Sequence, residues 1–141
     1  MSERLLDLLG LMRKAGAVQI GEMNSGTACR EGKAKLLLLA KDASENAVKR
    51  AESFVFGRRT LLMTLPYTKD EIAEKLGSGV CAMAAVTDLG FANAFVSKLS
   101  AQYPGQYEDT ASALSKKLEK TDRRKKAAAS EKNRKKRERE D

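Results

Sequence analysis

The side chains best suited to binding chemistry are the cations near the C-terminus. Residues 116–141 hold 13 Lys or Arg against 6 Asp or Glu, a net charge of +7, whereas residues 1–115 carry a net charge of only +1. The densest basic clusters are Arg123, Arg124, Lys125 and Lys126, followed by Arg134, Lys135, Lys136 and Arg137. No aromatic residue follows Tyr107, so contacts of this segment with phosphates should be electrostatic, independent of sequence and sensitive to salt. A solubilising segment without a partner is the alternative.

Residue patterns typical of enzymes are missing from the sequence. The chain has no His, no G-x-x-x-x-G-K-[ST] phosphate loop and no G-x-G-x-x-G dinucleotide fingerprint. Cys29 and Cys81 lack the spacing of a zinc site, and we predict both to be small buried hydrophobes in a reduced, cytoplasmic protein. We therefore predict a protein that is not an enzyme and has neither a metal nor a cofactor.

Two carboxylates leave a ligand-binding alternative open. Asp42 and Asp88 each follow a predicted strand, and α/β proteins often bind small molecules or phosphate at the carboxyl ends of strands. A helix-capping or junction role explains each of them better, because Asp is a preferred residue immediately before a helix.

The elements that must position these residues alternate regularly along the chain. Residues 35–40 form an almost continuous apolar run, which is typical of a strand covered by helices on both faces. Caps, glycine stops and apolar periodicity predict helices near 3–15, 22–31, 45–56, 69–76 and 89–100, and strands at 18–20, 35–40, 59–64 and 81–87. The expected fold class is α/β, a three-layer α/β/α sandwich with a small four-stranded sheet.

The domain organisation follows the loss of this periodicity. We predict a compact domain over residues 1–102, a linker over 103–115, and a basic tail over 116–141 that is either disordered or a solvated helix. No stretch approaches the roughly 18 apolar residues of a membrane-spanning helix, and the N-terminus lacks the basic start of a signal peptide.

Several short stretches, taken in their joint order and spacing, point to one family. They are 5–16 (LLDLLGLMRKAG), 21–22 (GE), 32–36 (GKAKL), 40–44 (AKDAS) and 85–92 (AVTDLGFA). Residues 5 to about 98 thus resemble the kink-turn-binding ribosomal protein family, in words the large-subunit seven-A-e and thirty-e superfamily, and especially its small bacterial YlxQ-like members. The basic tail lies outside the resemblance.

The resemblance implies a thirty-e-like fold and a non-catalytic, ribosomal or ribosome-associated protein that recognises kink-turn-like RNA. It places the RNA contact at the start of the second helix, where free N–H groups favour phosphate. The residues that would supply this surface are Gly21, Glu22, Asn24, Ser25, Gly26 and Thr27. At Met23, Asn24 and Thr27 the chain departs from the Asn, Glu and Lys usual in the family.

The resemblance implies a second contact in the loop before the last strand. Its residues here would be Gly79, Val80 and Cys81, with an ordinary turn as the alternative. Nearby in sequence, Arg30, Lys33 and Lys35 could contact phosphates or be the solvated ends of a buried strand. The expected partner is RNA and the expected state a monomer. A protein-binding adaptor in translation or ribosome assembly, without specific kink-turn binding, is the alternative function.

Overall fold

A mixed β-sheet forms the centre of the fold. A computed structural model describes residues 2–77 and 81–140, with side chains for residues 4–77 and 81–132. Within these residues the sheet has the order β1-β4-β2-β3, in which β2 and β3 are parallel and β4 is antiparallel to both of its neighbours. The strands are β1 (Val18–Ile20), β2 (Leu36–Leu39), β3 (Leu61–Thr64) and β4 (Met83–Val86).

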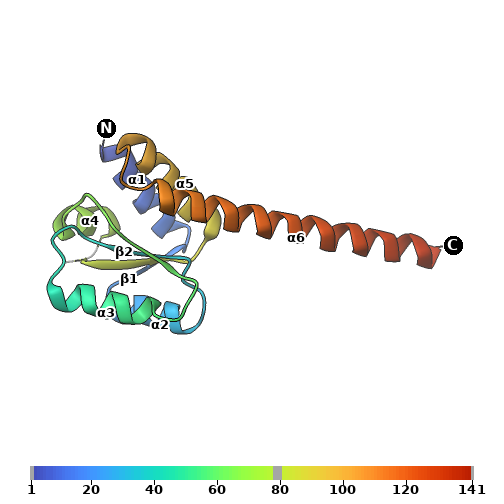
Figure 1. Ribbon diagram of the computed structural model, residues 1–141, viewed down its shortest axis with the longest axis horizontal. Coiled ribbons are helices and arrows are strands. Elements are labelled where there is room, and N and C mark those ends of the chain that lie inside the picture. The colour runs from blue at the N-terminus through green and yellow to red at the C-terminus, as the bar shows by residue number, and fades with distance from the viewer. Residues whose placement is uncertain (1, 78–80, 141) are drawn as a thin grey trace.

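Helices cover both faces of the sheet and complete the predicted three-layer α/β/α sandwich (Figure 1). One face is covered by α1 (Ser2–Lys14), α4 (Lys69–Leu76), α5 (Leu89–Gln102) and the start of α6 (Glu108–Glu140). The other face is covered by α2 (Glu22–Arg30) and α3 (Glu45–Val55). The predicted fold class is therefore confirmed, with element boundaries that differ by one or two residues.

The apolar run in β2 explains why the sheet is covered on both sides. Successive side chains of a strand point to opposite faces. Leu36 and Leu38 accordingly join the core beneath α1, α4 and α5, while Leu37 and Leu39 join the core beneath α2 and α3. All four leucines are at most 2% exposed, which is the burial expected for a central strand between two helical layers.

The structure corrects the predicted linker. Tyr107 and Leu114 are buried in the main core, and the Tyr107 hydroxyl donates a hydrogen bond of 3.1 Å to the Thr64 carbonyl oxygen. Together with the half-buried Ala111, they form an i, i+4, i+7 stripe on the first turns of α6, a period the sequence interpretation missed. Residues 103–115 thus belong to the compact fold.

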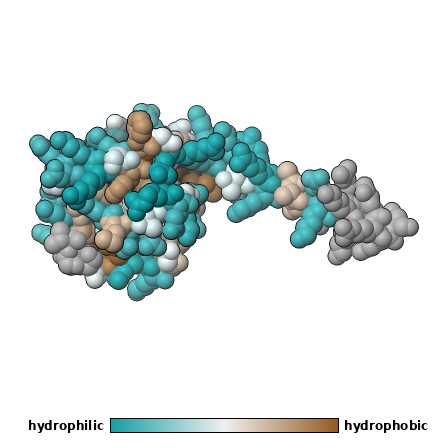
Figure 2. Space-filling view, turned by 90° about the horizontal axis from the view of Figure 1, so that it is seen from below, coloured by the Kyte–Doolittle hydropathy of each residue, from teal (hydrophilic) through white to brown (hydrophobic). Residues whose placement is uncertain are grey.

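The basic segment continues α6 away from the body as one long helix (Figure 1). Residues 122–132 are exposed. Figure 2 views the molecule from below the orientation of Figure 1 and shows that the coloured portion of this projecting helix is largely hydrophilic. Among the described helices, none combines the length and apolar character that a membrane crossing requires.

Candidate nucleic-acid interface

The start of α2 presents backbone donors that no side chain caps. Gly21 occupies the N-cap position with a φ of 91°, a conformation that strongly favours glycine, and therefore offers no side chain to the helix. The first backbone bond of the helix runs from the Ser25 N–H to the Gly21 carbonyl oxygen at 2.9 Å. The preceding N–H groups of the first turn have no intrahelical acceptor and can donate to an anion.

Backbone hydrogen bonding joins this helix start to the segment before β4. The Gly21 N–H donates to the Met83 carbonyl oxygen at 2.9 Å, and the Cys81 thiol donates to the same oxygen at 3.3 Å. The two stretches that the resemblance singles out are therefore adjacent here, although they are separated by some sixty residues in sequence. Gly79 and Val80 lie outside the described residues.

Both cysteines have a structural role in the described fold. Cys29 and Cys81 are each 1% exposed and neither forms a disulfide, as predicted. Burial raises the pKa of both thiols, which keeps them protonated. The Cys81 side chain lies inside the core and its thiol donates to the Met83 carbonyl oxygen, so this side chain offers no surface to RNA, and the contact expected of residues 79–81 stays a prediction.

Two further members of the predicted surface are buried. Ser25 is fully buried, and its hydroxyl has no hydrogen-bond partner among the described residues. Gly26 is also buried, and a Cβ at this position would lie 2.8 Å from Cζ of Phe54 on α3. The expectation that Ser25 and Gly26 form an RNA surface is corrected, since both residues are buried and Gly26 packs against α3.

The exposed first turn of α2 is formed by Glu22, Met23 and Asn24. The Glu22 carboxylate, half-buried, forms an ion pair with Arg50 of α3. Met23 is 83% exposed, and the Asn24 side-chain amide donates to the Ile20 carbonyl oxygen at 3.0 Å. Arg50 was missed at the sequence level because its partner is 28 residues away and no local pattern links them.

Thr27 and Arg30 lie further along the same helix and bond to each other. The Thr27 hydroxyl donates to the Met23 carbonyl oxygen at 3.0 Å, and an Arg30 guanidinium nitrogen donates to the Thr27 oxygen at 3.2 Å. Thr27 is half-buried, so its hydroxyl offers a smaller surface than the Lys side chain that the resemblance leads us to expect at this position.

The predicted phosphate contacts Arg30, Lys33 and Lys35 lie at the other end of the sheet from Gly21. The nine residues of α2 separate its two ends by on the order of 12 Å. The Lys35 N–H donates to the Val86 carbonyl oxygen, where β4 ends and β2 begins. These three cations therefore do not gather around the start of α2.

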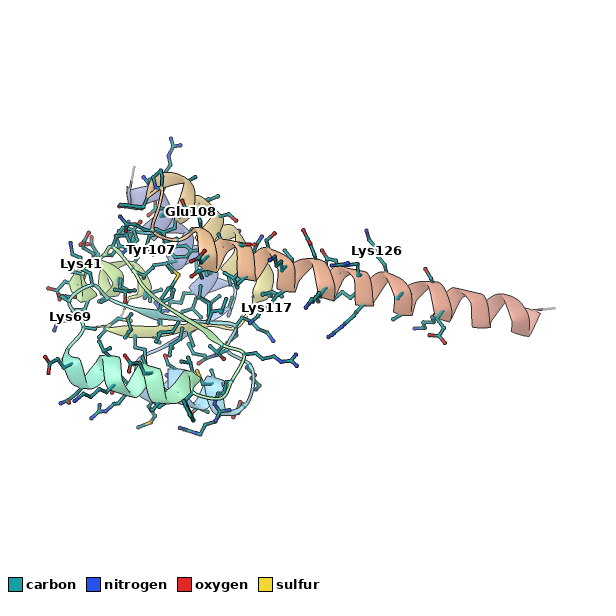
Figure 3. The ribbon with its side chains drawn as sticks, in the orientation of Figure 1. Lys41, Lys69, Tyr107, Glu108, Lys117 and Lys126 are labelled. Atoms are coloured by element: carbon teal, nitrogen blue, oxygen red, sulfur yellow. The ribbon has the colours of Figure 1, made fainter. Side chains whose placement is uncertain are left out.

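Figure 3 shows the two ends of the sheet clearly. Lys41 and Lys69 lie at the end where β2 finishes, whereas Lys117 lies at the opposite end, where α6 leaves the body. The chain thus has one polar region at the end of the sheet where β2 finishes and a second at the end where α6 leaves the body.

Asp42 and Asp88 lie at opposite ends of the sheet as well, because β2 and β4 are antiparallel. Asp42 accepts a hydrogen bond of 2.8 Å from the Lys69 N–H at the start of α4, and Asp88 accepts one of 2.9 Å from the Phe91 N–H in α5. Both carboxylates accept hydrogen bonds from backbone N–H groups at the start of a helix, which is the role that the sequence favoured. They do not converge on one small-ligand site.

Comparison with known proteins identifies a shorter relative that matches the chain over most of its own length. The chain is 35% identical over 96 residues to the RNA-binding protein YlxQ of Bacillus subtilis, a match that covers 65% of this chain and 91% of YlxQ. No protein-family profile matches the chain. The part of this chain left unmatched is large enough to include the long C-terminal helix.

Solved structures share the fold at lower sequence identity. A protein of unknown function from Bacillus halodurans C matches 66% of this chain and 93% of its own length, with a TM-score of 0.61 and 22% identity. The Giardia lamblia 15.5kD RNA binding protein matches 71% of this chain and 88% of its own, with a TM-score of 0.58 and 18% identity. At these identities the comparison shows a shared fold.

Proposed function

The chain belongs to the YlxQ-like family of RNA-binding proteins, and from this premise we propose that it binds structured RNA without catalysing a reaction. Its RNA is of the kink-turn type, a sharply bent internal loop, and the protein acts in the cytoplasm on the ribosome or on another structured RNA. The observation that supports this function is the uncapped start of α2 beside the segment before β4.

The first turn of α2 can contact both phosphate and base. Its free N–H groups and the positive end of the helix dipole favour a phosphate oxygen. The Met23 side chain, exposed at this turn, offers an apolar surface to an unstacked base. Asn24 adds an amide that can hydrogen-bond a base edge once it exchanges its Ile20 contact for RNA.

Glu22 makes this turn different from a purely cationic RNA surface. A carboxylate at the first helical position interacts favourably with the helix dipole and would repel phosphate if it were unpaired. Arg50 neutralises it and brings a guanidinium to the same edge. We infer that Arg50, rather than the cation usual in α2, supplies the positive charge.

Binding of the full chain to two RNAs tests this function. One RNA contains a kink-turn, and the other is a duplex of the same length in which the internal loop is fully paired. We expect tighter binding to the kink-turn RNA, and Met23→Ala or Asn24→Ala should reduce that preference. Leu11→Ala is the matched control for Met23→Ala, because Leu11 is also an exposed apolar side chain, 60% accessible, but on α1.

Each outcome has a definite meaning. Equal affinity for the two RNAs across a salt series would contradict kink-turn recognition and leave general RNA binding. A full chain that binds neither RNA at low salt would favour the protein-binding adaptor. Loss of preference in Leu11→Ala as well as in Met23→Ala would place the contact away from α2.

A further inference from the structure

A basic groove lies at the end of the sheet away from the α2 start. It has a volume of about 640 Å³ and is formed where α6 passes the start of β2 and the turn between α3 and β3. The described lining contains no Asp or Glu. Its cationic members are Lys35, Arg58, Arg59, Lys117, Lys120 and Arg124. We call this surface the basic groove.

The contribution of α6 follows helical periodicity. Lys117, Lys120, Thr121 and Arg124 all line the groove, and their spacing of i, i+3, i+4, i+7 puts them on one face of the helix. At about 100° per residue, the acidic residues of this stretch fall on the opposite face. The helix therefore presents cations to the body and its carboxylates to solvent.

Hydrogen bonds to backbone carbonyls hold the groove in shape. The Arg58 guanidinium donates to the Cys29 carbonyl oxygen at 3.0 Å, and the Lys117 ammonium donates to the Arg59 carbonyl oxygen. The Thr60 hydroxyl donates to the Ala34 carbonyl oxygen at 2.8 Å. These contacts hold Arg58, Thr60 and Lys117 in the wall of the groove.

Among the described residues, no carboxylate compensates the positive charge of the groove. Within the described part of the chain, none of its six cations forms an ion pair with a carboxylate. The pKa of Lys117 is lowered, first by burial and then by repulsion from Lys35 and Arg59. An anion placed among these side chains would relieve that repulsion.

An exposed aromatic residue lies close in sequence to the groove residue Arg58. Phe56 is the C-cap residue directly after α3, lies two residues before Arg58, and is 86% exposed. A fully solvated Phe has no role in the core. Beside a phosphate-binding surface, such a ring can stack on an unpaired base, which favours a nucleic acid over an isolated anion.

We propose that the basic groove binds the sugar–phosphate backbone of an RNA segment beyond the one held at the α2 start. This inference rests on the proposed function, because the same RNA would reach both ends of the sheet. It assigns the proximal turns of α6 to a formed binding surface, whereas the sequence suggests only a general electrostatic tail.

A pair of charge-matched variants tests the groove in the full chain. Lys120→Gln with Arg124→Gln removes two charges from the groove face of α6. Arg123→Gln with Lys126→Gln removes two charges, of the same two residue types, from other faces of the same helix; Lys126 lies on its projecting part in Figure 3. The probes are a kink-turn RNA with extended flanking helices and the same RNA with those helices trimmed.

We expect the groove pair to weaken binding of the extended RNA on the order of tenfold and to lower the salt slope by about 1.4 to 1.8. The control pair should weaken binding of the extended and the trimmed RNA to the same extent, and by less than the groove pair, since surface charges without a formed site act weakly. The preference for kink-turn over paired RNA should persist in both. Circular dichroism checks that each variant is folded.

Several results would overturn the proposal. Equal losses in the two pairs would show that only net charge matters and would leave the α2 interface intact. Equal losses of affinity for the extended and the trimmed RNA would show that the groove does not contact the flanking RNA helices. Saturable binding of inorganic phosphate alone to the groove lysines, followed by NMR, would indicate a free-phosphate site instead. A wild-type chain that binds neither RNA would overturn the groove and the proposed function together.

Discussion

Gly26 of α2 lies against the aromatic ring of Phe54 of α3, so closely that a Cβ at residue 26 would be 2.8 Å from Cζ and 2.9 Å from Cε1. This contact lets the two helices on that face of the sheet approach each other. It also directs the first turn of α2 outward, because the side of the helix that carries Gly26 is used for packing.

Gly26→Ala is expected to destabilise the fold by about 1 to 3 kcal/mol, since an extra methyl group must displace a packed ring. Helix propensity alone predicts a gain of about 1 kcal/mol, so the two explanations differ in sign. Urea unfolding measures the change. Phe54→Leu in the same chain should recover part of the loss, and a stabilised Gly26→Ala would show that the ring moves freely.

Ser25→Ala is expected to raise the free energy of unfolding by about 1 kcal/mol, because the buried hydroxyl has no hydrogen-bond partner in the described fold. Affinity for RNA should not change. Ser53→Ala is the control, since the Ser53 hydroxyl donates to the Arg50 carbonyl oxygen at 2.8 Å on an exposed surface. A loss of RNA affinity in Ser25→Ala would mean that the buried side of α2 becomes exposed on binding.

The ion pair between Glu22 and Arg50 should affect RNA binding through charge. Glu22→Gln is expected to tighten binding a few-fold, because it removes a carboxylate beside the phosphate site, and Arg50→Gln should weaken binding by a similar factor. Asp7→Asn removes a carboxylate paired with Lys75 at 2.8 Å, away from α2, and is the control. If Glu22→Gln and Arg50→Gln changed the RNA affinity in the same direction, this electrostatic role would be ruled out.

Both thiols should resist alkylation while the protein is folded. Burial raises the pKa of Cys29 and Cys81 above the ordinary 9.0, so the thiolate forms mainly in the unfolded chain. The raised pKa values of the two thiols stabilise the folded state below pH 9, and this stabilisation is lost as the pH rises through the pKa values of the folded protein. Iodoacetamide labelling with and without urea measures this, and rapid labelling of the native protein would contradict it.

Truncation should separate the core part of α6 from its projecting part. A chain that ends after residue 127 is expected to keep its stability, whereas one that ends after residue 105 loses the burial of Tyr107 and Leu114. The loss should be at least about 3 kcal/mol, given the apolar area removed. Thermal unfolding measures both. Equal stability would restore the predicted domain end at residue 102.

Phe56→Ala should weaken binding of RNA that carries unpaired bases by about fivefold, through loss of stacking. Leu11→Ala again provides an exposed apolar control, and fully paired RNA should not distinguish the two variants. Anisotropy titrations at fixed salt measure the difference.

Local signals in the sequence were enough to predict the elements. Ser44 caps α3 through a bond of 3.2 Å from the Ala47 N–H, and Thr68 with Glu71 forms the capping box of α4. These interactions span only three residues, so a short window of sequence contains both partners. The four-leucine strand was predictable for the same reason.

The candidate site was predicted only in part. The family resemblance implied RNA contacts at the start of α2 and in the loop before β4, but it did not state that the two segments lie side by side. The inward orientation of Ser25, Gly26 and Cys81 was not expected, since it depends on where α3 and β4 pack. Arg50 and the groove-lining Lys117 carry no local signal, because each is positioned by a contact more than twenty residues away in sequence.

The sequence by itself determined the types and order of the elements, the two-sided burial of the central strand and the concentration of positive charge after residue 115. Only the tertiary structure decided the mixed strand order, the division of polar residues between two ends of the sheet and the inclusion of Tyr107 and Leu114 in the core. The physical reason is range: caps and periodicity act within a few residues, whereas strand pairing and helix packing join segments distant in the chain.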